Sequence, residues 1–287
     1  SIVMRLLPKN RGTLSLEKLG FEPDHLSLLH SWLACPNGIV LVTGPTGSGK
    51  STTLYAALEA MRDGSNKIIT VEDPVEYQVS GVTQIQAHNE IGYTFSRALR
   101  AILRQDPDTI MIGEIRDLDT AQIAIQSALT GHLVLSTLHT NDAASAFTRL
   151  VDMGLEPFLV AASVRGVQAQ RLVRRLCEQC AVDDDLPLLP QGWSISQPAF
   201  SAANWKKAVG CSHCHHTGYR GRLGIYELVA LDGELQQLVN RQAPLQEIKS
   251  LIRQQGQRTL FEDGLIKASR GLTSIEEVMR VAYVEHD

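Results

Sequence analysis

The chain has 287 residues, of which 44% are hydrophobic and 20% charged, enough for one full core and a smaller second unit. Its formal net charge of -4 and sequence pI of about 6.1 give no broad basic field, so nucleic acid is not expected as a partner. The longest apolar runs, such as residues 38–42, are far shorter than the ~20 residues of a membrane span. Membrane association is therefore expected only through partner proteins.

The order of predicted elements indicates an α/β core. Residues 2–7 look strand-like from the start of the chain, so we expect upstream N-terminal domains to be missing. A β-branched run at 39–42, a glycine-rich turn and a helix-forming stretch at 52–58 form the opening of a βαβ unit. Similar runs at 67–71, 109–112 and 133–137 alternate with helical periodicity, which predicts a parallel sheet covered by helices.

The pattern changes after residue 176. A cysteine- and histidine-bearing stretch comes first, and helical periodicity returns beyond Leu231. The last predicted helix carries Thr273 and Glu276 at the spacing of a capping box. We therefore expect three units: a core at 1–176, a metal-binding module at 177–216 and a C-terminal helical subdomain at 217–287.

One segment matches the phosphate-loop pattern at every defined position, between a predicted strand and a predicted helix. Its glycines let successive backbone N–H groups point at phosphates, and the following helix adds its dipole. Lys50 is expected to pair with the β- and γ-phosphates, and Ser51 to hold Mg²⁺. The alternative is a glycine-rich turn that merely joins strand to helix, but both the pattern and its strand-to-helix context match a phosphate loop. The predicted nucleotide-binding residues are Gly44, Pro45, Thr46, Gly47, Ser48, Gly49, Lys50, Ser51 and Thr52.

Hydrolysis also needs a carboxylate near the γ-phosphate. The apolar run 109–112 delivers Glu114 to the tip of a predicted strand, where it can polarise water or position Mg²⁺. A second acidic cluster, residues 72–76, follows the run at 67–71 on the edge where α/β sheets bind ligands. From the residues alone, that cluster is equally well explained as an acidic turn fixed by Pro74.

Two histidines and three arginines are further candidates. His132 and His139 bracket one predicted strand, which suggests sensors of nucleotide state, although a lone histidine is more often structural. Arg97, Arg100 and Arg104 recur at helical spacing and share one face. Such a face is usually just solvated, but in a ring of subunits it can present an arginine to a neighbour's γ-phosphate.

Two C-x-x-C pairs, Cys177/Cys180 and Cys211/Cys214, have the spacing with which thiolates chelate one metal ion. Thirty residues separate the pairs, a longer gap than is usual for a zinc ribbon. Disulfides are the alternative, but they are uncommon in the reducing compartments where ATP-dependent proteins act. Four thiolates leave no position for water, so we expect structural zinc.

The order of these motifs is more specific than any one of them. The phosphate loop at 44–51 is followed by an aspartate box at 70–77, an unusual Walker B at 110–117 and a histidine box at 131–142. Together they resemble the secretion ATPase superfamily, and most of all the C-terminal half of the type II secretion ATPases, over nearly the whole chain.

The resemblance implies a RecA-like P-loop core, a small zinc module built from the four paired cysteines, and a C-terminal helical subdomain. It also implies an ATP hydrolase that uses Mg²⁺, forms a homohexamer and drives pseudopilus assembly and protein export. Such a ring would be cytoplasmic and peripheral at the inner membrane, bound to secretion platform proteins through the absent N-terminal region and the ring face.

Roles for individual residues follow from the same resemblance. Glu76 and Glu114 become an acidic pair near metal and water, and His132 and His139 become the histidine-box residues. Three arginines are placed near a nucleotide, and which of them acts across a subunit boundary stays open: Arg5, Arg97 and Arg104.

Four other functions remain open at this stage. The least favoured is a nucleic-acid motor, because RecA-like cores also drive helicases but this chain has a near-neutral charge and no basic stretches interleaved with aromatic residues. A type IV pilus-assembly ATPase shares all four boxes. A pilus-retraction ATPase resembles the same core, although the cysteine module argues against it. A nucleotide-sensing module without turnover is disfavoured by Glu114, since a pure sensor needs no carboxylate beside the γ-phosphate.

Overall fold

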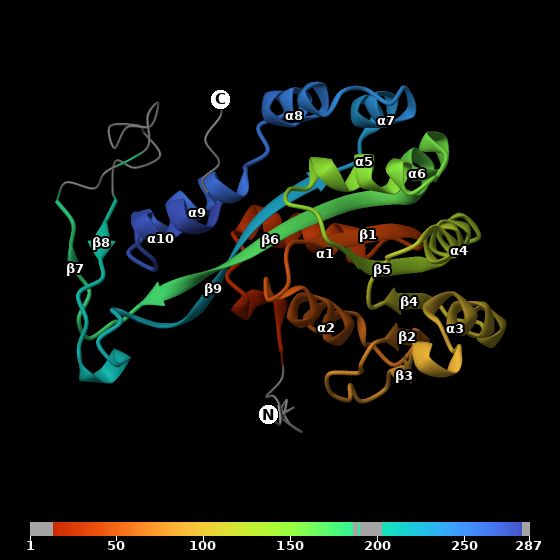
Figure 1. Cartoon of the computed structure of the whole chain (residues 1–287), viewed down its shortest axis with the longest axis horizontal. Helices are drawn as coiled ribbons and strands as arrows, with labels where there is room; N and C mark the ends of the chain where they lie inside the picture. Colours follow the sequence, from red (N-terminus) through yellow and green to blue (C-terminus); the bar gives the residue numbers. More distant parts are fainter. Residues whose placement is uncertain (1–13, 186–188, 190–202, 283–287) are drawn as a thin grey trace.

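A seven-stranded sheet forms the centre of the computed structural model, which describes residues 14–185, 189 and 203–282 (Figure 1). Its strand order is β3-β2-β4-β5-β1-β6-β9. Neighbouring strands run parallel, except that β9 runs antiparallel to β6. The strands are β1 (Gly38–Thr43), β2 (Ile68–Glu72), β3 (Thr83–Gln86), β4 (Thr109–Ile112), β5 (Leu133–Leu138), β6 (Val164–Leu176) and β9 (Tyr219–Ala230).

Helices cover both faces of this sheet. Successive residues of β1 alternate between two cores, with Ile39 and Leu41 in one and Val40 and Val42 in the other. The second core is closed by α1 (Pro23–Leu33) and α2 (Lys50–Met61). The first is closed by α3 (Phe95–Ile102), α4 (Leu118–Leu129), α5 (Ala144–Asp152), α6 (Pro157–Ser163), α7 (Gly233–Asn240) and α8 (Leu245–Gln254). The predicted parallel α/β core is therefore confirmed.

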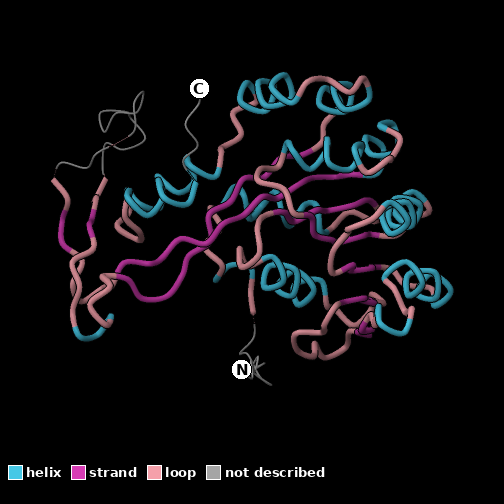
Figure 2. Tube along the Cα trace, viewed as in Figure 1, coloured by secondary structure: helices cyan, strands magenta, loops and turns pink. Residues whose placement is uncertain are grey.

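The strands β6 and β9 form a long ribbon that extends beyond the rest of the sheet (Figures 1 and 2). The cysteine-bearing segment lies between them in sequence and includes the short strands β7 (Val182–Asp183) and β8 (Lys206–Lys207). Residues 219–230, expected in a helical subdomain, instead complete the main sheet, because Ile225 and Val229 enter one core and Tyr226 and Leu228 the other. Helices resume only at α7, so the expected boundary at 217 falls just before a core strand.

Two C-terminal helices, α9 (Leu260–Ser269) and α10 (Ile275–Ala282), pack against the ribbon. The first turn of α10 is capped by Ser274, whose Oγ accepts a hydrogen bond from the Glu277 N–H at 3.2 Å. The predicted cap at Thr273 is off by one residue, because the Thr273 hydroxyl donates to the carbonyl of Arg174 instead (2.8 Å).

Glu277 fastens α10 to β6. Its side chain is fully buried, with one carboxylate oxygen 2.7 Å from Arg174 Nη2 and the other 2.6 Å from Arg280 Nη2. The Arg174 backbone N–H also donates to it at 2.9 Å. Burial alone would raise the pKa of Glu277, but hydrogen bonds from Arg280 and Arg174 outweigh it and lower that pKa to about 2.

Replacing Glu277 by alanine is expected to lower the free energy of unfolding by about 2–3 kcal/mol at pH 7, measured by urea titration. Breaking a buried ion pair costs about 3–5 kcal/mol, and the half-exposed arginines reduce that cost. The exposed neighbour Glu276 supplies the control, since Glu276→Ala should change stability by less than about 0.5 kcal/mol.

The same ion pair predicts a pH dependence. The pKa of Glu277 is about 2 in the fold and about 4.3 in an unfolded chain, so its contribution is complete above about pH 5 and disappears as the pH falls toward 2. The stability gap between Glu277→Ala and Glu276→Ala should therefore shrink from pH 6 to pH 3. Equal stability of the two variants at pH 7 would contradict this assignment.

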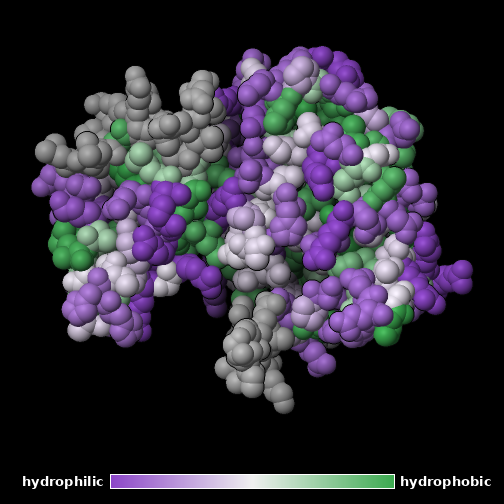
Figure 3. Space-filling model, viewed as in Figure 1, coloured by the Kyte–Doolittle hydropathy of each residue, from purple (hydrophilic) through white to green (hydrophobic). Residues whose placement is uncertain are grey.

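The surface mixes hydrophilic and apolar residues on the face drawn in Figure 3, where apolar side chains form separate patches. Among the helices in the described part of the chain, none has the length and apolarity needed to cross a bilayer.

Candidate nucleotide site and metal centre

The carboxyl ends of four neighbouring strands carry most of the candidate residues. Because β2, β4, β5 and β1 run parallel side by side, the segments that leave their ends meet along one edge. In that order the segments carry the acidic cluster 72–76, Glu114, His139 and the phosphate loop 44–51. Residues from all four line one cavity of about 590 Å³.

The phosphate loop joins β1 directly to α2. Gly44 has φ 148°, and a Cβ there would lie 2.5 Å from the Gln170 carbonyl oxygen. Gly49 caps α2 with φ 92°, so the helix begins at Lys50. Both positions need glycine, for lack of room at Gly44 and for backbone conformation at both. Six of the nine predicted nucleotide-binding residues at 44–52 line the cavity: Thr46, Gly47, Gly49, Lys50, Ser51 and Thr52.

Lys50 lies against the loop that it follows. Its Nζ donates hydrogen bonds to the carbonyl oxygens of Gly44 (2.8 Å) and Pro45 (3.0 Å). Burial lowers the pKa of Lys50, while the nearby Glu114 acts in the opposite direction. The ammonium group and the N-terminus of α2 therefore give this end of the cavity a positive character suited to phosphate.

Glu114 stands on the cavity wall two residues after β4. Its side chain is 14% exposed, forms an ion pair with Arg116 and lies with Oε2 3.3 Å from His139 Nε2. The backbone before it is held from both sides, since Gly113 donates to the Val71 carbonyl (2.8 Å) and accepts from the Thr137 hydroxyl (2.7 Å). A carboxylate fixed in this way can orient water and accept a proton.

The acidic cluster has a buried member beneath an accessible one. Glu72 is buried and accepts hydrogen bonds from the hydroxyls of Tyr55 and Thr70, the latter at 2.6 Å. Burial and the Glu72 carboxylate raise the pKa of Tyr55, which keeps its hydroxyl protonated. That hydroxyl also accepts from the Glu76 N–H (3.1 Å) and so fixes the turn that brings Glu76 to the cavity.

The two predicted histidines lie at opposite ends of β5. His139 follows the strand and lines the cavity. His132 precedes it, and its Nδ1 lies 2.8 Å from the Pro107 carbonyl oxygen. A strand of this length separates its ends by roughly 20 Å. The expectation that both reach one γ-phosphate is therefore wrong for His132 within a single chain.

None of the predicted arginines in the described residues lines this cavity. Arg97 on α3 and Arg104 in the following 3₁₀ turn (Leu103–Gln105) are exposed. Arg100, on the same helix, forms an ion pair with Asp119 at 2.8 Å. Arg5 lies outside the described residues. A role for Arg5, Arg97 or Arg104 at a neighbour's nucleotide stays a proposal.

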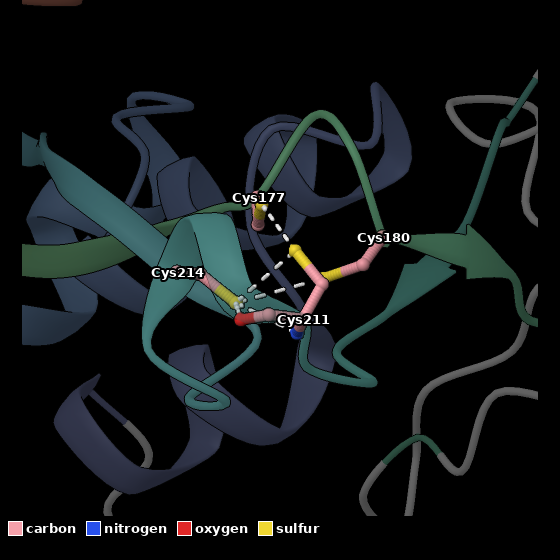
Figure 4. Close-up of side chains that lie close together, drawn as sticks. All are labelled: Cys177, Cys180, Cys211 and Cys214. Carbon is pink, nitrogen blue, oxygen red and sulfur yellow. Dashed lines mark hydrogen bonds between the residues drawn. The ribbon is translucent and has the colours of Figure 1, made fainter.

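The four cysteines meet at the far end of the β6–β9 ribbon (Figure 4). Their sulfurs all lie within 4.8 Å of one another, and three of the Sγ–Sγ distances are 3.9 Å (Cys177–Cys211), 3.7 Å (Cys180–Cys214) and 3.8 Å (Cys211–Cys214). Four sulfurs at about 2.3 Å from a tetrahedral zinc would be about 3.8 Å apart, whereas a disulfide needs about 2.05 Å. The donor set and its spacing fit zinc.

The module also favours a thiolate at one position. Burial opposes ionisation of Cys214, yet N–H groups of Cys211 and Gly218, each 3.2 Å from its sulfur, help to lower its pKa to about 6. Backbone N–H groups directed at sulfur are the support that a thiolate ligand needs.

Comparison with known proteins decides the family. The sequence profile described as "Type II/IV secretion system protein" matches residues 1–280. This chain belongs to that family. The chain is 55% identical over 280 residues to the type II secretion system protein HxcR of Pseudomonas aeruginosa, covering 98% of this chain and 56% of the relative. It is 50% identical to the type II secretion system ATPase E of Vibrio cholerae, with 98% and 55% covered.

Relatives from pilus systems are nearly as similar. The type IV pilus assembly ATPase PilB of Thermus thermophilus is 48% identical, with 96% of this chain and 31% of PilB covered. Among solved structures, the pilus retraction motor PilT with bound ADP is 30% identical, with a TM-score of 0.70, and the match covers 96% of this chain and 68% of PilT. The chain spans about half the length of these type II relatives.

The structure adds residues at or beside the cavity that the sequence analysis did not single out. Arg116 lines the cavity beside Glu114, and Arg222 and Leu172 reach it from β9 and β6. The buried Gln170 contacts the phosphate loop, with Nε2 2.7 Å from the Ser48 carbonyl oxygen. Arg116 lies inside the Walker B segment and Arg222 in a segment that shares the family resemblance, whereas Leu172 and Gln170 had no sequence signal because they are far from the phosphate loop in the chain.

Proposed function

We propose that this chain is the ATP-hydrolysing part of a type II secretion ATPase. The observation that carries the proposal is the convergence of a phosphate loop, its lysine and a fixed carboxylate, Glu114, on one cavity. Family membership supports it, as does the word ATPase in the names of the Vibrio and Thermus relatives.

The proposed reaction divides among the residues of the cavity edge. The phosphates of ATP lie on the loop 44–51, with Lys50 at the β- and γ-phosphates and Thr52 beside them. Mg²⁺, held by Ser51 with the acidic turn at Glu76 nearby, would neutralise charge on the phosphate oxygens. Glu114 orients the attacking water and takes up its proton. His139, which contacts Glu114, senses whether a nucleotide is bound.

The remaining parts of the proposal concern assembly. Arg5, Arg97 and Arg104 are candidates to reach a neighbour's γ-phosphate in a homohexamer, because the two described arginines are exposed and away from their own cavity. The ring would be cytoplasmic, attached at the inner membrane by secretion platform proteins, and no nucleic acid partner is proposed. Zinc at Cys177, Cys180, Cys211 and Cys214 would stabilise the ribbon end and leave no open position for water.

Oligomerisation is tested by the concentration dependence of turnover. If neighbours share a site, phosphate release per chain should rise with protein concentration, together with the ring fraction seen by analytical ultracentrifugation. Turnover per chain that is constant while the protein stays monomeric would contradict the shared site.

The type IV pilus-assembly function is the second candidate, favoured by the 48% identity to PilB. Hybrid proteins separate the two functions. This chain should restore secretion when it replaces residues of matching extent in a type II secretion ATPase, and should fail to restore pili when placed in a pilus-assembly ATPase. Restoration of pili alone would reverse the assignment.

A further inference from the structure

Gln170 is a buried amide in the strand next to the phosphate loop. Its side chain is only 2% exposed, on the face of β6 that carries α2. The pairing of β6 with β1 ends at Thr43 and Ala169, so Gln170 lies where the loop leaves the sheet. A buried amide is costly unless its polar atoms are paired, so its partners define what it does there.

Two of those partners lie before and after Lys50 in the sequence. Gln170 Nε2 donates to the Ser48 carbonyl at 2.7 Å, and Gln170 Oε1 accepts from the Thr53 hydroxyl at 2.9 Å. Gln168 Nε2 donates to the same Oε1 at 2.8 Å. Because a carbonyl can only accept, the Ser48 contact requires Nε2 on that side of the amide. Gln170 is therefore hydrogen-bonded to the end of the loop at Ser48 and to the first turn of α2 at Thr53.

The hydrogen bond from Gln170 to Ser48 fixes the orientation of the Ser48–Gly49 peptide, and with it the direction of the Gly49 N–H. In a trans peptide the C=O and the following N–H point in opposite directions. Because the Ser48 carbonyl is held toward Gln170, the Gly49 N–H is directed to the opposite side, and both Gly49 and Lys50 are residues that line the cavity. Inward-pointing N–H groups are what a phosphate loop offers to its ligand.

We infer that Gln170 is a positioning residue for the phosphate site: its amide aims the Ser48–Gly49 peptide at the phosphates of a bound nucleotide. The inference deepens the proposed function, because it assigns a support to the same site. It does not depend on turnover, since ADP carries phosphates that the loop would hold.

The test compares two buried amides in the same strand. Gln170→Met removes the bond to Ser48, whereas Gln168→Met removes a buried amide on the same face and leaves that bond in place. ADP affinity is measured by titration calorimetry and unfolding by thermal denaturation. We expect Gln170→Met to weaken ADP binding about tenfold, and Gln168→Met to change it less than about twofold.

Different results distinguish positioning from simple packing. Both variants should lose thermal stability, because each removes at least one buried hydrogen bond of a glutamine amide. A merely structural role would lower both unfolding temperatures and leave both ADP affinities at the wild-type value, and that result overturns the inference. Gln170→Glu, which keeps the shape but places a second acceptor against the Ser48 carbonyl, should weaken ADP at least as much as Gln170→Met.

Failure of the proposed function has its own signature. A wild-type chain that binds ADP but never hydrolyses ATP contradicts the proposed function, and the comparison of Gln170 with Gln168 still decides the positioning role. An unchanged ADP affinity in Gln170→Met, beside normal wild-type turnover, contradicts only the positioning role.

Discussion

Glu114→Gln is expected to bind ATP with near-normal affinity and to release phosphate at least about 100-fold more slowly than the wild-type chain. The amide keeps the size of the side chain but can neither accept a proton nor carry the charge that orients water, and general-base catalysis contributes about 10²–10⁴-fold. The geometry supports this choice, because Glu114 is mostly buried on the cavity wall beside His139.

Single-turnover measurements with excess protein separate chemistry from binding. The exposed Glu90 gives a control, since Glu90→Gln makes the same chemical change outside the cavity and should leave both rates unchanged. Normal hydrolysis by Glu114→Gln would contradict the role of Glu114 as general base. Glu76, which also lines the cavity, would then be the next candidate.

Loss of zinc is the second large expected effect. The wild-type chain should contain about one zinc ion per chain by elemental analysis, and Cys214→Ser should weaken zinc binding at least about 100-fold, because a structural site depends on all four thiolates. ADP binding should survive, since none of the four cysteines lines the cavity.

The fifth cysteine supplies the control for this change. Cys35 lies outside the cluster, with its Sγ 3.4 Å from the Ser31 carbonyl oxygen, so Cys35→Ser should keep its zinc. Equal zinc content in the two variants, or cysteines that resist thiol reagents without any metal, would contradict the zinc assignment.

Sequence reasoning succeeded where the signal was local. The phosphate loop and the Walker B strand each have a sequence pattern confined to a few residues, and the strands around them have β-branched runs bounded by turns. Each C-x-x-C pair is likewise a local turn, so the four thiols were predictable even though thirty residues separate the pairs.

The sequence analysis failed where the position of a residue depends on how the whole sheet is assembled. A strand has two ends, and the sequence around His132 and His139 does not show which end faces the ligand; only the parallel pairing of β5 with β1 and β4 decides it. Residues 219–230 were wrongly assigned to a helical unit. They form a strand that pairs with β6, more than forty residues earlier, and no local pattern shows such a distant pairing.

Support residues were the hardest to predict. Gln170 lies about 120 residues from Ser48 in the chain, so no spacing connects them. Glu72 was visible as part of an acidic cluster, but its burial and its contact with Tyr55 depend on how α2 packs on the sheet. The cap of α10 was off by one residue, because Thr273 and Ser274 are equally good caps and only the packing on β6 chooses between them.

The most direct test of the central claim is steady-state phosphate release from MgATP by the purified chain, alone and joined to the N-terminal region of a relative. Lys50→Ala is measured in parallel, because it removes the ammonium group of the phosphate loop. The proposed function predicts turnover by the wild-type site in at least the longer protein, and none in either Lys50→Ala protein. ATP binding without turnover in both wild-type forms would contradict it and would make the chain a nucleotide sensor.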